Sequence, residues 1–145
     1  MSGRVFLDTN IFVYAIDGEA PPSKSSRAAA VVHDALQSRT GVISYQVVQE
    51  FINVARKGHP GITEAHLIRV LDSMLFPMLQ VHSSSQLFRE AMQLASRFQF
   101  PWYDSLIVAA ALEAGCTILY SEDLQHGMKV ANLTIINPFT ESRLM

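Results

Sequence analysis

The stretch VFLDTNIFVYAID, residues 5–17, decides the fold, because three polar residues in it separate one apolar run from the next. The first run is typical of a short buried strand, and Asp8, Thr9 and Asn10 follow it directly. Two interpretations are open. The polar residues could form a turn in which Asp8 caps a helix that starts near Ile11, or Asp8 could be a functional carboxylate at the tip of a buried strand.

The rest of the chain alternates between short apolar runs and stretches of helical periodicity. Strands are expected at 4–7, 41–44, 76–81, 116–121 and 132–137. Helices are expected at 24–39, 45–58, 63–75, 86–99 and 103–115. Ser25 or Ser26 should cap the first of them, Thr63 the third, and a residue within Ser83–Ser85 the fourth. Gly41, Gly58 and Gly115 should end the first, second and fifth. This alternation predicts an α/β fold: a three-layer α/β/α domain over residues 1–145, with a short parallel sheet of about five strands.

Composition limits the class of protein. With 49% hydrophobic residues the chain of 145 residues is not disordered, and its length suffices for one core. No apolar run approaches the length of a membrane span, and the first residues lack the pattern of a signal peptide. The single Cys116 excludes an internal disulfide and fits a reducing compartment. We therefore expect a cytoplasmic protein.

Net charge does not decide whether the partner is a nucleic acid. The chain carries 11 Lys and Arg against 13 Asp and Glu, which by itself argues against binding a polyanion. If four of those acids held metal ions, however, the remaining balance would be positive. The charged fraction of 17% is low enough to suggest that a partner covers some apolar surface. Candidates for that surface are Phe51, Ile62, Leu67, Leu75 and Phe76.

Four acids fall where ligands bind in a parallel sheet, outside the carboxyl ends of the strands. Asp8 follows the first predicted strand, and Asp123 follows the strand at 116–121, with Glu122 as a competitor beside it. Asp104 lies in the first turn of a helix, where the helix dipole alone would favour an acid. Each position has an ordinary structural explanation, but the four together with this topology indicate a site.

Glu50 is the most informative of the four acids. Val47, Phe51 and Val54 surround it at helical spacing, and no Lys or Arg lies three or four residues away. An inward carboxylate of this kind is costly unless a cation neutralises it. Convergent carboxylates also repel one another, whereas hard oxygen ligands suit Mg²⁺ or Mn²⁺. We therefore expect a divalent metal site.

Other chemistries lack their motifs. The five His form no HExxH pair, the lone Cys excludes a zinc thiolate site, and no glycine-rich phosphate loop or GxSxG elbow occurs. A phosphatase of the haloacid dehalogenase type would need an acid where Asn10 stands, and a receiver domain would need a Lys at a strand end. His126, close to Asp123 in sequence, is a weaker candidate for a functional role.

Three blocks of the sequence resemble PIN-domain ribonucleases, and within them the VapC-type toxins of toxin–antitoxin pairs. The blocks are VFLDTNIFVYAID, VISYQVVQEFINVARK and YDSLIVAAALEAGCTILYSEDLQHG. The resemblance implies that Asp8, Glu50, Asp104 and Asp123 are the catalytic and metal-binding acids, and that Asn10 and Ser121 are auxiliary polar residues. Asp123 is preferred over Glu122 because Ser121 stands two residues before it, as in the family pattern, and Glu122 is kept as a third auxiliary residue.

The resemblance implies an endoribonuclease that depends on Mg²⁺ or Mn²⁺ and leaves 5′-phosphate and 3′-hydroxyl ends. It also implies a small antitoxin that covers the acidic pocket, and a homodimer. Candidates to bind the RNA backbone are Arg27, Arg56, Lys57 and Lys129, and Trp102 and Tyr103 could either stack an unpaired base or pack in the core. The alternative function is a catalytically silent module of the same fold that binds RNA or protein.

Overall fold

The computed structural model describes residues 3–58 and 62–140, which form one six-stranded sheet in the order β3-β2-β1-β4-β6-β5. The strands are β1 (Arg4–Leu7), β2 (Gly41–Ser44), β3 (Leu79–Val81), β4 (Cys116–Tyr120), β5 (Lys129–Val130) and β6 (Leu133–Ile136). All neighbours pair in parallel except β5 and β6, which form an antiparallel hairpin. The predicted parallel sheet is confirmed, with one more strand than expected.

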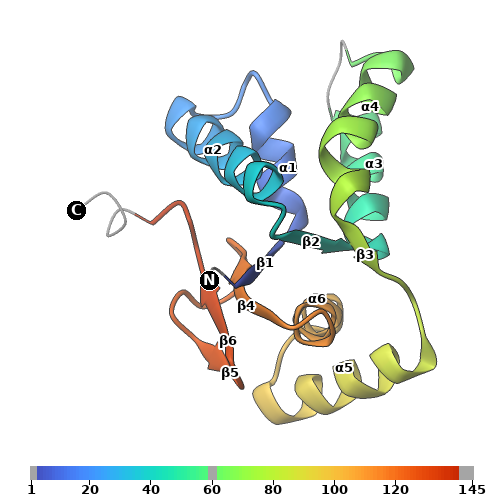
Figure 1. Cartoon of the computed structure of the whole chain (residues 1–145), viewed down its shortest axis with the longest axis vertical. Helices are drawn as coiled ribbons and strands as arrows, with labels where there is room; N and C mark the ends of the chain where they lie inside the picture. The colour runs from blue at the N-terminus through green and yellow to red at the C-terminus, as the bar shows by residue number, and fades with distance from the viewer. Residues whose placement is uncertain (1–2, 59–61, 141–145) are drawn as a thin grey trace.

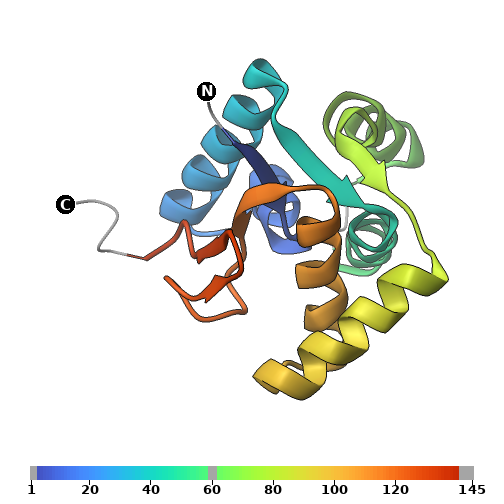
Figure 2. The ribbon, with the colours of Figure 1, turned by 60° about the horizontal axis from the view of Figure 1, so that its bottom comes forward.

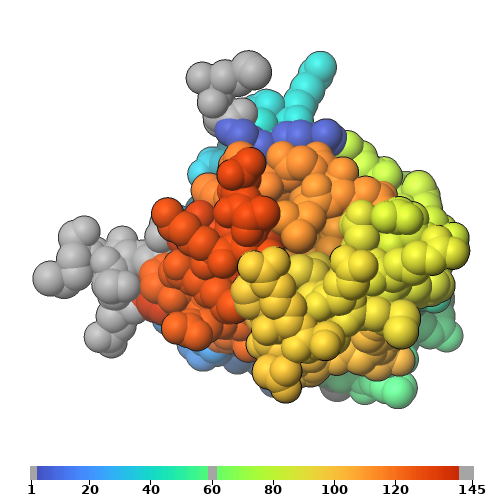
Figure 3. All heavy atoms as spheres, turned by 90° about the horizontal axis from the view of Figure 1, so that it is seen from below, coloured from blue at the N-terminus to red at the C-terminus, as the bar shows by residue number. Residues whose placement is uncertain are grey.

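Helices cover both faces of this sheet. They are α1 (Thr9–Ile16), α2 (Pro22–Ser38), α3 (Tyr45–Gly58), α4 (Glu64–Val70), α5 (Ser85–Phe98) and α6 (Trp102–Glu113). In Figure 1, α1 and α2 lie on one side of the sheet and α5 and α6 on the other. Figure 2 shows α6 against the sheet with α5 packed outside it. Seen from below, α5 covers much of one face beside the β5–β6 hairpin (Figure 3). The three-layer α/β/α prediction is confirmed.

The centre of the sheet explains why the first polar residues are held firmly. Phe6 and Leu7 are fully buried, and Leu7 lies opposite Tyr120 in the register of β1 and β4. The backbone amide of Asp8 then donates to the Tyr120 carbonyl at 3.0 Å, which extends the ladder by one step. Because β1, β2 and β4 run in parallel, their carboxyl ends open on the same edge of the sheet.

The predicted strand at 76–81 is wrong in its first half. A π-helix (Leu71–Leu75) continues α4, a 3-10 turn (Phe76–Met78) follows, and only Leu79–Val81 pairs as β3. Pro77 has no backbone amide to donate to a ladder, so this part of the apolar run is helical instead. Strand β5 was not expected, because two residues are too short to carry an alternating pattern.

The end of α2 also differs from the prediction. Arg39, with φ at 58°, adopts the left-handed conformation that closes the helix, so Gly41 does not end it. Gly41 is instead the first residue of β2, where an added Cβ would lie 2.6 Å from the Met78 sulfur and 2.9 Å from the Ala35 Cβ. A close approach between sheet and α2 therefore requires glycine at this position. The start of α2 follows Pro21 and has no side-chain cap, contrary to the expected Ser25 or Ser26.

The expected apolar surface is mostly core. Phe51, Leu67 and Leu75 are buried, so these three candidates are wrong, whereas Phe76 is exposed and Ile62 is partly buried. The predicted caps at Thr63 and within Ser83–Ser85 are confirmed: Thr63 Oγ1 accepts from the His66 amide, and Ser84 Oγ accepts from the Leu87 amide.

Two findings bear on the class of protein. None of the helices in the described ranges is both long enough and apolar enough to cross a membrane. The Cys116 side chain is buried at the start of β4, and burial raises the pKa of its thiol to about 11, so it packs as a small apolar residue.

Candidate active site

Asp8 is a buried carboxylate at the junction of β1 and α1. It is 5% exposed and serves as the N-cap of α1, with Oδ1 accepting from the Thr9 amide at 2.7 Å. Its other oxygen, Oδ2, accepts from Ser121 Oγ at 2.8 Å across the β1–β4 pair. The helix-cap interpretation is therefore confirmed, and the same residue also presents its carboxylate at the strand tip, where a functional role stays a prediction.

Glu50 reaches the same edge of the sheet from α3, which begins directly after β2. Its Oε1 accepts from Thr9 Oγ1 at 2.6 Å and its Oε2 accepts from Gln46 Nε2 at 3.2 Å. The side chain is partly buried, and among the described residues these neutral donors are its hydrogen-bond partners. The expectation that only apolar side chains surround the Glu50 carboxylate is wrong, because the uncharged side chains of Thr9 and Gln46 donate hydrogen bonds to it.

Asp104 is placed by the most buried helix of the molecule. Residues 105–111 of α6 are all buried, so the helix is fixed in the core and its first turn projects at the carboxyl edge of the sheet. Ser105 Oγ donates to the Trp102 carbonyl at 2.6 Å, which closes this first turn. Asp104 therefore stands at a helix N-terminus, where the dipole favours a negative charge.

Asp123 completes the group from the loop after β4. Its backbone amide donates to Ser121 Oγ at 3.2 Å, and its carboxylate oxygens lie 3.3 and 3.5 Å from Asn10 Nδ2. Ser121 thus contacts two acids at once, since its hydroxyl donates to Asp8 and accepts from the Asp123 amide. Of the three residues expected to be auxiliary, Asn10 and Ser121 contact the predicted acids, whereas Glu122 accepts hydrogen bonds from Tyr14 and Lys24 instead.

Glu122 points to different partners. It accepts a hydrogen bond from the Tyr14 hydroxyl at 2.6 Å and forms an ion pair with Lys24. The Lys24 ammonium also lies 4.8 Å from the centre of the Tyr14 ring. Burial alone would raise the pKa of Glu122, but the hydrogen bonds from Lys24 and Tyr14 and the Lys24 charge lower it. Glu122 does not line the pocket that contains Asp123.

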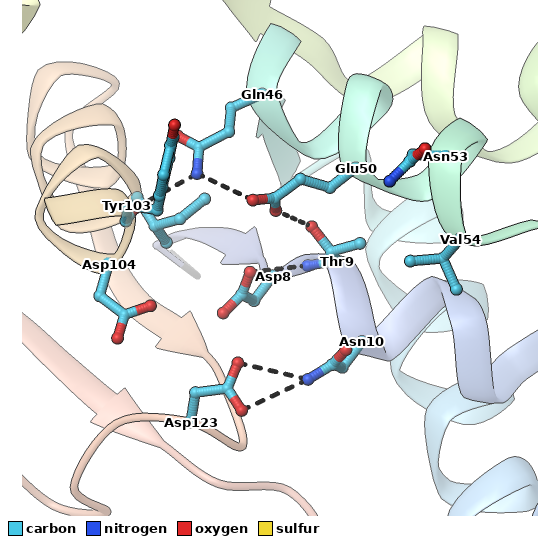
Figure 4. A pocket seen from close by; sticks show the side chains of 11 residues that line it. Asp8, Thr9, Asn10, Gln46, Glu50, Asn53, Val54, Tyr103, Asp104 and Asp123 are labelled. Atoms are coloured by element: carbon cyan, nitrogen blue, oxygen red, sulfur yellow. Dashed lines mark hydrogen bonds between the residues drawn. The ribbon is translucent and has the colours of Figure 1, made fainter. Parts of the chain in front are cut away.

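The four predicted acids line one pocket of about 290 Å³. Figure 4 shows Asp8, Asp104 and Asp123 facing a common space, with Glu50 across it beside Thr9 and Gln46. The four carboxylates come from four separate elements: the end of β1, α3, α6 and the loop after β4. The other lining residues are Thr9, Asn10, Gln46, Asn53, Val54, Tyr103 and Ile107. No Lys or Arg of the described residues is among them.

This gathering of like charges is visible in the pKa values. Burial raises the pKa of Asp8 from 3.8 to about 6, with a further contribution from the charges of Asp123 and Glu50. Burial and the charges of Asp123 and Glu50 also raise the pKa of Asp104. For Asp123 the causes are burial and the charges of Glu122 and Glu50. Each raised pKa means that the ionised form of the acid is disfavoured in the protein alone. A nearby cation would favour the ionised form.

The donor set fits a hard divalent cation. Four carboxylates at one pocket, with amide and hydroxyl oxygens beside them, are ligands that Mg²⁺ and Mn²⁺ prefer. Among residues 3–58 and 62–140, no thiol or imidazole lines the pocket. Across residues 3–58 and 62–140, no three His, Cys, Asp or Glu side chains are arranged, as they stand, to hold one metal ion. The carboxylates therefore have to draw together, or share water molecules, to bind it. Mg²⁺ usually keeps several waters.

The four candidate RNA-binding cations lie outside this pocket. Arg27 Nε donates to the Pro138 carbonyl, and Arg56 forms an ion pair with Glu64. Lys57 is exposed near the end of α3, and Lys129 is exposed on β5. His126 Nδ1 accepts from the Asn137 amide at 2.9 Å, so its ring supports the chain after β6.

Two residues of the site were missed from the sequence. Thr9 and Gln46 are both buried and hold Glu50 from two sides. Gln46 also donates to the Tyr103 carbonyl at 3.2 Å, which connects α3 to the start of α6. The signal was present for Gln46, because it lies four residues before Glu50 on the same helical face. The contact of Thr9 depends on how α1 and α3 pack.

A family model described as PIN domain matches residues 5–128. The match includes all four acids and both auxiliary residues, and it confirms the resemblance in the sequence. A search of curated proteins gives no significant match.

Solved structures of similar fold include a chain of a toxin–antitoxin complex and a toxin. A toxin–antitoxin complex from Klebsiella pneumoniae has a chain 18% identical, with a TM-score of 0.65 over 92% of this chain and 97% of that one. FitAcB from Neisseria gonorrhoeae is 16% identical, with a TM-score of 0.65 over 93% and 98%. VapC20 of Mycobacterium tuberculosis, a Sarcin-Ricin loop cleaving toxin, is 20% identical, with a TM-score of 0.58 over 82% and 89%. At these identities the similarity concerns the fold.

Proposed function

Because this chain belongs to the PIN domain family, we propose that it is an endoribonuclease that hydrolyses RNA phosphodiester bonds and depends on Mg²⁺ or Mn²⁺. One observation carries the proposal: four carboxylates from four separate elements line a single pocket that no Lys or Arg of the described residues lines. Such a pocket repels phosphate by itself. It becomes complementary to phosphate once divalent cations occupy it.

The acids have one role in this proposal. Asp8, Asp104, Asp123 and Glu50 would hold the cation, and a bound cation would lower the pKa of water and neutralise charge on the phosphate. Hydrolysis joins the water oxygen to phosphorus and breaks the bond to the 3′ oxygen, so the products carry a 5′-phosphate and a 3′-hydroxyl. No carboxylate becomes a covalent nucleophile.

The neutral residues fix the acids before substrate arrives. Ser121 and the Thr9 amide occupy one lone pair on each oxygen of Asp8, so its carboxylate cannot rotate freely. Thr9 Oγ1 and Gln46 do the same for Glu50. Asn10 contacts Asp123. Preorganisation of this kind lowers the cost of assembling a charged site at the moment of reaction.

The proposal extends to a toxin of a toxin–antitoxin pair. Its support is the similar fold of a chain in the Klebsiella pneumoniae toxin–antitoxin complex and of VapC20. The partner would be a small antitoxin that covers the acidic pocket, and the active form would be a homodimer.

The test is RNA cleavage by the purified chain without any antitoxin. We expect cleavage with Mg²⁺ or Mn²⁺, none with EDTA, and none by Asp104→Asn, with 5′-phosphate ends on the fragments. Cleavage that survives both EDTA and the variant would come from a contaminant and would remove the support for the proposal. A folded, metal-binding protein that cleaves no RNA in a total-RNA pool would favour the catalytically silent binding module.

A further inference from the structure

Two large aromatic side chains in the first turn of α6, just before Asp104, are exposed to solvent. Tyr103 is 66% exposed and Trp102 is 39% exposed, although the seven residues of α6 after Asp104 are all buried. The alternative that these rings pack in the core is therefore wrong for Tyr103. Tyr103 itself lines the pocket, beside Gln46 in Figure 4, and it directly precedes Asp104.

The backbone under these rings is fixed relative to the acids. Gln46 Nε2 donates to both the Tyr103 carbonyl and Glu50, each at 3.2 Å, so one amide ties the Tyr103 backbone to an acid of the site. Ser105 Oγ holds the Trp102 carbonyl, and Pro101 sets the chain entering the helix. An aromatic ring on a rigid turn loses little entropy on contact with a ligand.

We infer that Tyr103, with Trp102 beside it, is a stacking platform for an unpaired base of the RNA whose phosphate enters the acid pocket. This inference rests on the proposed function. The pocket lining includes four carboxylates and, among described residues, no basic side chain, so charge attraction for RNA at this pocket would come from bound cations alone. A contact that does not depend on charge would add to it. Stacking of a base on an aromatic ring supplies this, and it requires a base that is free of a duplex.

The surroundings of Tyr103 agree with a flat, largely neutral ligand. Val54, 38% exposed, and Ile107 add apolar surface to the pocket lining. Asn53 on α3 also lines the pocket, and its side-chain amide makes no hydrogen bond within the described part of the chain. A base edge could use such an amide. A stacking contact of this kind would tolerate different identities of the stacked base.

The test measures RNA binding apart from cleavage. In an Asp104→Asn background with Mg²⁺ present, short fluorescein-labelled oligoadenylate and oligouridylate RNAs are titrated by anisotropy. We expect Tyr103→Ala to weaken binding by about 5- to 150-fold and Tyr103→Phe to retain it, since stacking needs the ring and not the hydroxyl. Tyr103→Leu should behave like Tyr103→Ala, which separates stacking from simple apolar contact. Phe88→Ala, on α5 and 39% exposed, is the matched control and should change nothing.

A second readout locates the RNA. Trp102 is the single tryptophan of the chain and directly precedes Tyr103, so its emission reports on the first turn of α6. Emission should change on adding oligoadenylate and remain unchanged with an oligomer of abasic ribose phosphates.

Several outcomes would overturn the inference. Equal RNA affinity for Tyr103→Ala and its parent would do so, as would a response of Trp102 to the abasic oligomer. A change of oligomeric state in Tyr103→Ala, with RNA affinity intact, would make this turn of α6 a protein contact instead. Cleavage assays distinguish the two proposals. If the wild-type chain binds RNA in a base-dependent way but does not cleave it, the proposed nuclease function is wrong. If Tyr103→Ala leaves RNA cleavage unchanged, the proposed stacking platform is wrong.

Discussion

Glu122 and Asp123 are adjacent in the chain, yet they lie in opposite electrostatic surroundings. Glu122 turns toward Lys24 and the Tyr14 hydroxyl, and these partners lower its pKa. Asp123 turns into the pocket toward Asn10, where burial and neighbouring carboxylates raise its pKa. One peptide bond therefore separates an acid that already has its cation from an acid that has none.

The difference teaches how to separate structural acids from functional ones. An acid paired with a cation contributes to the fold, and it has little left to offer a ligand. A set of acids without a cation destabilises the folded chain, so such a set is a candidate site for binding a cation. The distinction makes predictions for each side of the comparison.

The largest effect on RNA cleavage is expected when the negative charge of Asp123 is removed, and the same change at Glu122 serves for comparison. Asp123→Asn should lower RNA cleavage by about 100- to 1,000-fold, because it removes a ligand of the metal. Glu122→Gln, one residue away and equal in charge change, should lower cleavage by less than about 10-fold. Single-turnover cleavage rates with saturating Mg²⁺ measure both. Equal losses in the two variants would erase the contrast between these acids.

Asp8 gives a prediction for stability in EDTA. Its folded pKa of about 6 is above its ordinary 3.8, so the protonated form favours folding below pH 3.8, and this contribution is lost as pH rises through 6. At pH 8 the ionised Asp8 carboxylate lowers the free energy of unfolding by up to about 3 kcal/mol, at ~1.4 kcal/mol per pKa unit. Asp8→Asn should therefore stabilise the metal-free protein at pH 8 and do so far less at pH 4.

Urea unfolding at the two pH values measures this difference. The same variant should lose the stabilisation that Mg²⁺ gives to the wild-type chain at pH 8. If the difference in the free energy of unfolding between Asp8→Asn and the wild-type chain were the same at both pH values, burial would not raise the pKa of Asp8.

A smaller effect is expected from the neutral partners of the acids. Thr9→Val keeps the shape of the side chain but removes the hydroxyl that donates to Glu50 at 2.6 Å. We expect cleavage to fall by about 10-fold, with a weaker affinity for Mn²⁺ measured by calorimetry. Thr9→Ser keeps the hydroxyl and is the control. If Ser and Val behaved alike, the hydrogen bond would have no part in the site.

The smallest effect belongs to the paired acid. The Lys24 and Glu122 side chains are 34% and 22% exposed, so solvent screens their ion pair, and a coupling energy below about 1 kcal/mol is expected. A double-mutant cycle of Lys24→Met and Glu122→Gln, followed by urea unfolding at low and high salt, measures it. A coupling that grew with salt would contradict an electrostatic origin.

Much of the fold was predictable because its strands are short, apolar and bounded by clear signals. The run that became β2 is buried throughout, those that became β1 and β4 each contribute buried residues, and the helix at 85–98 carries its Ser84 cap. The region around Pro77 was mispredicted because an apolar run of that length suits a strand or a helical turn equally. The choice there depends on the missing amide of proline and on packing against Gly41.

The acids were predictable for a different reason: the end of a strand and the first turn of a helix are recognisable in sequence. Their partners were harder. Thr9 meets Glu50 across 41 residues of chain, a contact that only the packing of α1 on α3 creates. The choice of Asp123 over Glu122 depended on Ser121 alone, and the ion pair with Lys24 was invisible because it spans 98 residues.

The order of the strands also has a consequence in time. Asp8 and the Ser121 hydroxyl that holds it are 113 residues apart, because β4 is the neighbour of β1 in the sheet. At 5–20 residues per second, roughly 6–23 s pass during synthesis between the two residues. During that interval the nascent chain carries its first acid without the loop that supplies Ser121 and Asp123. A chain that cleaves RNA would therefore stay harmless to the ribosome that is making it until most of its length has been translated.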